Sequence, residues 1–279
     1  MKRFLIGIIT LFPLIVRAQP LKFTARVGYT GYRGDLQSKN FSLNPANEGL
    51  GVGLMYSSSS KLSIRVEYNY GVVEANDLWN DPQYQLRNLS FKSKIQELAL
   101  LADWSLLDPE DSYIVPYVFA GIAFFHFNPY TFDSTGTRYY LQPLSTEGQG
   151  LPGRAAPYKL NQVALPFGGG VRFEISSMFT IAYELGFRKT FTDYIDDAST
   201  TYVDQNRLQS FKGLKAVELA FRGDEVKAAP SAYPAEGTIR GSAVSKDWYY
   251  FHGLHLIISL NRTYSPSARS STDCPRVYF

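Results

Sequence analysis

The sequence has few of the residues that build disulfide frameworks, metal centres and nucleic-acid surfaces. It contains one cysteine, Cys274, among 279 residues, together with three histidines and a formal net charge of +3. A single cysteine excludes an internal disulfide framework, and so small a charge gives no basic footprint for nucleic acid. After the N-terminal segment, no apolar run approaches the ~20 residues that a membrane-spanning helix needs.

The first 18 residues have the order of a secretory signal peptide. Lys2 and Arg3 precede an almost wholly apolar run, 4–16, and Ala18 offers a small residue at a cleavage site. The run is too short to span a membrane comfortably. We therefore expect residues 1–18 to be a signal peptide and the rest of the chain to be exported.

The remaining chain shows alternation with a period of two. Between residues 61 and 72, the apolar Ile64 and Val66 alternate with Arg65 and Glu67, which predicts a strand with one apolar and one charged face. Most such segments exceed the ~5–6 residues usual in soluble sheets and match the ~9–11 of tilted membrane-spanning strands. The predicted strands are 22–32, 48–57, 61–72, 91–106, 113–127, 162–176, 178–191 and 248–260.

Short and long connections alternate strictly between these strands. The long ones follow the first, third, fifth and seventh strands, at 33–47, 73–90, 128–161 and 191–247. Outer-membrane barrels have short periplasmic turns and longer extracellular loops. We predict an all-β fold for residues 19–260: an eight-stranded antiparallel transmembrane outer-membrane β-barrel with long extracellular loops. A soluble exported barrel of the lipocalin kind is the alternative, and it requires a polar exterior and an apolar cavity.

Inward-facing side chains fill a barrel of eight strands, so we expect no water channel. Opposite charges on that face can pair away from bulk water. The alternation also turns Arg26, Glu97 and Asp103 inward. The predicted lumenal charge network consists of Arg65, Glu67, Arg172, Glu174, Glu184 and Arg188.

The sequence offers no pattern typical of catalysis or of cofactor binding. His252 and His255 lie on opposite faces of one predicted strand, so they cannot share a metal there. The glycines at 168–170 lie within a predicted strand, whereas a phosphate loop needs a strand-to-helix turn. We predict no catalytic, cofactor or metal site, no enzyme activity and no small-molecule substrate.

One segment, TDYIDDASTTYVD at 192–204, is unusually rich in carboxylates and hydroxyls. It lacks the glycine of the standard calcium loop, which leaves two interpretations open: a non-standard calcium site, or a loop hydrogen-bonded to the barrel mouth. Its candidate residues are Thr192, Asp193, Tyr194, Asp196, Asp197, Ser199, Thr200, Thr201, Tyr202 and Asp204.

Five stretches together carry a resemblance to a known family. The chain resembles the PorG-like outer-membrane barrels of the type IX secretion apparatus of Gram-negative bacteria. This resemblance implies a non-enzymatic barrel that helps anchor or assemble a periplasmic ring built from a lipoprotein and its partner. The alternative is a stand-alone small barrel for adhesion or envelope integrity. The stretches are PYVFAGIAFFHFNP (116–129), LQPLSTEGQGLPG (141–153), LPFGGGVRFEIS (165–176), ELGFRKTFTDYIDDASTTYVD (184–204) and CPRVYF (274–279).

The C-terminal end typical of the PorG-like family matches Cys274 and Pro275 of this chain. The predicted topology places residues 261–279 in the periplasm as a C-terminal tail, and disulfides persist in that compartment. We hypothesise that Cys274 forms an intermolecular disulfide with the ring lipoprotein. The alternative is an unpaired thiol in a frayed tail.

Non-reducing electrophoresis of native membranes tests this hypothesis. The wild-type chain should run partly in a high-mass band that reductant removes, and Cys274→Ser should abolish that band. The absence of any band that depends on Cys274 would contradict the disulfide.

Overall fold

The computed structural model describes residues 21–37, 47–80, 82–226 and 232–260. The expected signal peptide (1–18) and C-terminal tail (261–279), including Cys274, lie outside the described residues.

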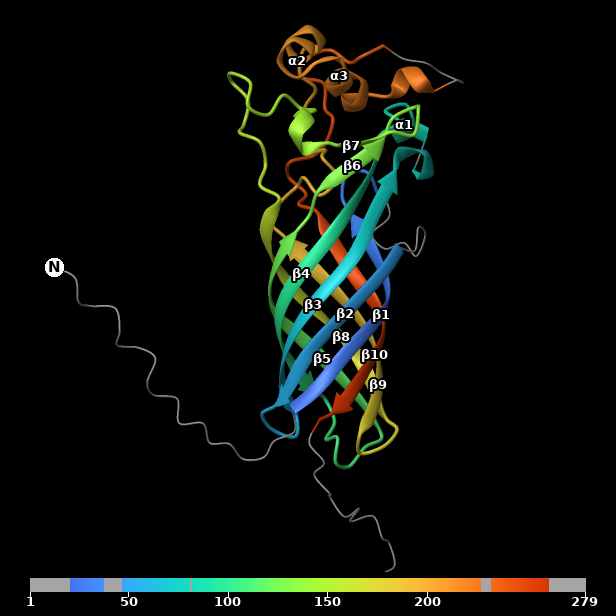
Figure 1. The fold of residues 1–279 in the computed structure, drawn as a ribbon, viewed down its shortest axis with the longest axis vertical. Coiled ribbons are helices and arrows are strands. Elements are labelled where there is room, and N and C mark those ends of the chain that lie inside the picture. The colour runs from blue at the N-terminus through green and yellow to red at the C-terminus, as the bar shows by residue number, and fades with distance from the viewer. Residues whose placement is uncertain (1–20, 38–46, 81, 227–231, 261–279) are drawn as a thin grey trace, which may run out of the picture.

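Eight long strands close into an antiparallel barrel, which confirms the predicted fold (Figure 1). Neighbours in sequence pair in most cases, and β1 pairs β10 from Lys22–Ser259 to Arg33–Trp248. The pairing of β3 with β4 completes the ring. The barrel strands are β1 (Leu21–Arg33), β2 (Asn47–Ser57), β3 (Leu62–Asn76), β4 (Ser90–Ser105), β5 (Ile114–His126), β8 (Asn161–Glu174), β9 (Phe179–Thr190) and β10 (Trp248–Ser259).

The barrel is apolar outside and charged inside. On β3, Ile64 and Val66 expose 44% and 47% of their surface, whereas the intervening Arg65 and the next residue, Glu67, expose 0% and 2%. Soluble proteins bury apolar residues and expose charged ones. The opposite distribution is expected of a barrel whose exterior contacts lipid. The soluble lipocalin-like alternative is therefore wrong, because it needs a polar exterior and an apolar cavity.

The two ends of the barrel differ as the connection lengths predict. Short turns join β2 to β3, β4 to β5 and β8 to β9 at one end. At the β8–β9 turn, the amides of Ile175 and Ser176 both donate to the carbonyl of Phe179. The long connections gather at the other end, as Figure 1 shows above the strands.

Two of the long connections form a folded cap, defined here as the described residues of 127–160 and 191–247. Its hairpin of β6 (Pro129–Phe132) and β7 (Arg138–Tyr140) extends the sheet by pairing with β4. The short helices in and near the cap are η1 (Asp77–Trp79), α1 (Pro82–Gln85), η2 (Gln142–Leu144), α2 (Gln205–Lys212), α3 (Leu214–Ala220) and η3 (Gly223–Glu225). Among the described residues, none of the helices has the length and apolar character needed to cross a membrane.

In the cap, a glycine joins α2 to α3. Asp204 caps α2 by accepting from the amide of Arg207. Gly213 has φ 87° and ψ 174°, a conformation open almost only to glycine, and it turns the chain sharply between the two helices. The two helices bury Leu208 and Val217 in a cluster with Val203 of the preceding loop.

The cap is packed onto the barrel mouth by a continuous apolar cluster. That cluster includes Ile95, Phe125 and Phe251 from the barrel and Ile195 and Leu219 from the cap. All five side chains are buried. The mouth is thus closed by side chains from both parts.

Candidate functional site

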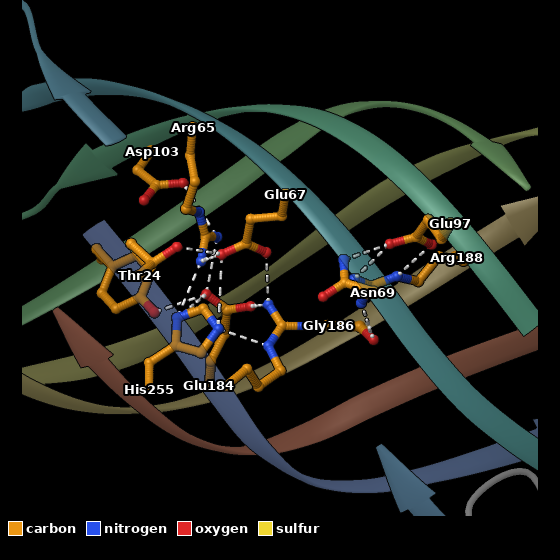
Figure 2. Close-up of polar contacts among 12 residues, drawn as sticks. Thr24, Arg65, Glu67, Asn69, Glu97, Asp103, Glu184, Gly186, Arg188 and His255 are labelled. Carbon is orange, nitrogen blue, oxygen red and sulfur yellow. Dashed lines mark hydrogen bonds and ion pairs between the residues drawn. The ribbon is translucent and has the colours of Figure 1, made fainter. Parts of the chain in front are cut away.

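The lumen contains a closed ring of ion pairs between two arginines and two glutamates (Figure 2). Arg65 lies 3.0 Å from Glu67 and 2.8 Å from Glu184. Arg26 lies 3.0 Å from Glu67 and 2.6 Å from Glu184. The four side chains come from β1, β3 and β9 and are all buried, so the ring ties three strands together across the lumen.

Further polar side chains extend this ring toward the short-turn end. Asp103 of β4 pairs with Arg65 at 3.3 Å and also with Arg172 of β8. The hydroxyl of Tyr117 donates to Glu184 at 2.7 Å. His255 lies between the guanidiniums of Arg26 and Arg65, 2.5 Å and 3.1 Å away.

A second charged group lies nearer the cap. Arg188 of β9 pairs with Glu97 of β4 at 3.1 Å, and its guanidinium lies 4.7 Å from the centre of the Phe251 ring. Glu97 also accepts from Asn69 at 2.9 Å and from Tyr249 at 2.7 Å. Both oxygens of this buried carboxylate are therefore satisfied.

The structure brings together most of the predicted lumenal charges but leaves one outside. Glu174 is exposed where β8 ends and makes none of the ion pairs found in the described part of the chain. Its position at the end of β8 places it at the barrel rim, where water can solvate the carboxylate. Asn69, Tyr117 and His255 were not predicted as members, although period two alone would have turned Asn69 and His255 inward.

The lumenal charges balance, since four arginines face four carboxylates, all of them buried except the half-buried Arg172. Taking an ion out of water costs several kcal/mol unless a partner compensates it. Removing one member of such a pair typically costs about 3–5 kcal/mol, because the other charge is left buried. The network thus explains how so narrow a lumen holds charges, and it fills the space that a solute would need. Its members are Arg26, Arg65, Arg172, Arg188, Glu67, Glu97, Asp103 and Glu184.

The carboxylate-rich segment 192–204, called the acidic loop below, packs at the barrel mouth. Most of its side chains point toward the barrel and the rest of the cap. Asp196 accepts from the hydroxyl of Tyr32 at 2.5 Å, and Asp247 lies 3.1 Å from the same hydroxyl. One hydroxyl proton serves only one acceptor, so the second contact needs a protonated carboxyl. Burial, together with neighbouring carboxylates, raises the pKa of Asp196 and of Asp247, which fits that arrangement.

Asp197 joins the acidic loop to two other parts of the cap. It accepts from the Tyr158 hydroxyl at 2.7 Å and lies 3.4 Å from Arg240. Arg240 also pairs with Glu147 at 3.2 Å. Glu147 in turn accepts from the amides of Ser199 and Thr200 at 2.8 and 3.0 Å. A single buried arginine and two carboxylates thus hold three chain segments together.

The rest of the acidic loop also has local partners. Ser199 donates to Asp193 at 2.8 Å, and the Tyr194 ring stacks on Tyr158 with centroids 4.5 Å apart. The carbonyl of Thr192 accepts from the amide of Asp247. Arg154 donates to the hydroxyl of Thr201 and to the carbonyl of Tyr202.

Metal binding finds no support in this geometry. Across the described ranges, no group of three or more His, Cys, Asp or Glu residues could hold a metal ion. The contacts of the loop are those of a segment hydrogen-bonded to the barrel mouth.

His126 ends β5, and His252 and His255 lie on β10. His126 contacts Asn161, and His252 contacts the Tyr183 hydroxyl. His255 is buried between two arginines, as described above.

Comparison with known proteins gives one family match and several similar folds. The model of a family described as "Domain of unknown function (DUF6089)" matches residues 2–219. No curated protein matches the chain.

Three solved outer-membrane proteins illustrate the similar folds. Neisserial surface protein A has a TM-score of 0.43 at 9% identity, covering 86% of this chain and 96% of its own. OprG of Pseudomonas aeruginosa has a TM-score of 0.40 at 12% identity, covering 86% and 97%. Ail of Yersinia pestis has a TM-score of 0.38 at 8% identity, covering 86% and 99%. At such scores and identities we carry over no function from these proteins.

The acidic loop should make the cap sensitive to pH. Burial raises the pKa of Asp193 and of Asp197 to about 6, above the ~3.9 of an unfolded chain. The folded loop then binds more protons than the unfolded loop between these values, so its stability falls as pH rises through them. Amide hydrogen exchange across residues 192–203 should give an opening free energy roughly 1–3 kcal/mol lower at pH 7.5 than at pH 5.

Three variants sharpen that measurement. Asp193→Asn and Asp197→Asn should each shrink the difference between the two pH values, because an amide does not titrate in this range. The exposed Asp111→Asn at the short-turn end is the control and should change nothing. An opening free energy that stays constant or rises toward pH 7.5 would contradict the account.

Proposed function

The chain belongs to the DUF6089 family, and from its apolar exterior and filled lumen we propose that it is a structural barrel of the outer membrane. More specifically, we propose that it belongs to a type IX protein secretion apparatus. There it would anchor or help assemble a periplasmic ring of a lipoprotein and its partner.

The observation that carries the structural role is the paired charge inside the barrel. Eight strands leave an interior that side chains can fill, and here the arginines of the network are held by carboxylates at 2.5–3.3 Å. A solute would have to break several buried ion pairs to pass. A role as a pore is thus disfavoured.

The ends of the barrel support a periplasmic partner. The amide of Leu260 donates to the carbonyl of Leu21 at 2.9 Å, so the first and last barrel residues meet at the short-turn end. In outer-membrane barrels that end faces the periplasm. Residues 261–279 would then start in the compartment where the ring is assembled, after export by the N-terminal signal peptide.

The assignment to the type IX apparatus is supported by the resemblance of five stretches to PorG-like barrels. Two of them, 141–153 and 184–204, meet in the structure, since Glu147 accepts from the amides of Ser199 and Thr200. Two of the stretches that carry the resemblance are therefore hydrogen-bonded to each other in the fold.

The cap favours a second candidate function, that of a stand-alone barrel for adhesion or envelope integrity. The cap is a packed structure at the long-loop end, which faces the outside in outer-membrane barrels. A folded surface at that end would serve contacts with the environment rather than with a periplasmic ring.

Partner capture from native membranes separates the two functions. An affinity tag beside Gly136, in the open β6–β7 turn of the cap, should leave the short-turn end free for a periplasmic partner. The full chain should recover periplasmic lipoprotein and its partner, and a matched chain ending at Leu260 should recover far less of both. Recovery of the barrel alone would contradict the secretion role and favour the stand-alone function. Heat-modifiable migration confirms that each tagged chain is folded.

A further inference from the structure

A groove crosses the exterior of the barrel where its strands enter the cap. It has a volume of about 630 Å³, within the ~300–1,000 Å³ typical of ligand sites. The last residue of β5, His126, and the first residue of β8, Asn161, both line it. The groove therefore lies at the border between the apolar exterior and the long-loop end.

The lining changes from apolar to polar along the groove. Leu98 and Phe124 expose 53% and 62% of their surface on the barrel side, and Phe191 adds a further exposed ring. Toward the cap the lining becomes amide and imidazole, with Gln96 and His126. Glu97 also lines the groove, but its carboxylate faces the lumen and is paired with Arg188.

The paired strands leave the sheet incomplete beside this groove. The register of β5 and β8 passes from Ala120–Phe167 to Ala123–Ala164 without pairing the residues between them. Pro166 lies in that interval, and proline has no backbone N–H to donate. The hydrogen-bond ladder between β5 and β8 is thus interrupted beside the groove.

Basic side chains flank the polar side of the groove. Lys94 is exposed on the same face of β4 as Gln96, two residues closer to the cap. Lys159 is exposed two residues before Asn161, and its carbonyl accepts from the lining residue Gln162 at 2.9 Å. Lys189 is exposed on the same side of β9 as Phe191, with its Nζ 6.0 Å from the Trp248 ring.

We propose that this groove binds one anionic phospholipid, with an acyl chain along Leu98 and Phe124 and its phosphate near Lys94 and Lys159. An acyl chain matches the apolar part by burial of nonpolar surface. The phosphate matches the lysines by charge, at the membrane border where basic residues bind anionic lipids. The site rests on the lipid-facing exterior and is independent of any secretion partner.

Native mass spectrometry of the full chain in an uncharged detergent tests head-group selection. With dioleoyl phosphatidylglycerol at low ratio, we expect one retained adduct per barrel. Dioleoyl phosphatidylcholine, which has the same chains but no net charge, should be retained roughly 10-fold less, the effect of about one charge-assisted hydrogen bond. Equal retention of both lipids overturns the proposal with the wild-type protein alone.

Two variants then locate the site. Lys94→Gln with Lys159→Gln should reduce retention of phosphatidylglycerol by roughly 10-fold, whereas Lys61→Gln at the short-turn end should leave it unchanged. Phosphatidylglycerol with a photoreactive chain should label peptides containing Leu98 and Phe124. Labelling spread evenly around the exterior, or an unchanged adduct in the double variant, would show only non-specific lipid and overturn the site.

Discussion

The pairing of charge inside the barrel is the constraint on which the rest of the structure depends. Four arginines and four carboxylates project from five strands into the lumen, and all except the half-buried Arg172 are buried. The buried ones are stable there only because an opposite charge lies within a few ångströms. The pairs specify which strands lie opposite one another, since Arg65 on β3 reaches Glu184 on β9. They also leave the exterior free to be apolar. A chain with its charges on the inside and its apolar residues on the outside has the distribution that lipid requires.

Sequence alone predicted much of this arrangement, because strand alternation is local. The charges of Arg65, Glu67 and Glu184 were assigned to the lumenal face by period two, and the structure places them there. Their partners could not be predicted, since the contact between β3 and β9 depends on closure of the whole barrel. Glu174 shows the other limit: its alternation points inward, but the strand ends at that residue and the side chain is exposed.

The cap illustrates how a carboxylate-rich sequence can be read in two ways. The aspartates of the acidic loop are suited to calcium by residue type, but they are partnered by Tyr32, Tyr158 and Arg240 from distant parts of the chain. Those partners lie in segments separated from the loop by more than 30 residues, so no local pattern could reveal them. Arg240 is the clearest case, because it lies outside any helix or strand and yet holds Glu147 and Asp197 together. The result is a folded surface at one end of the barrel and a closed lumen beneath it.

Conductance across a planar lipid bilayer tests the central claim most directly. The account predicts that the purified wild-type barrel inserts without producing sustained stepwise currents, because paired side chains fill its interior. Insertion is verified independently by heat-modifiable migration of protein recovered from the same lipid. Stable, reproducible current steps that scale with the number of inserted barrels would contradict a filled lumen.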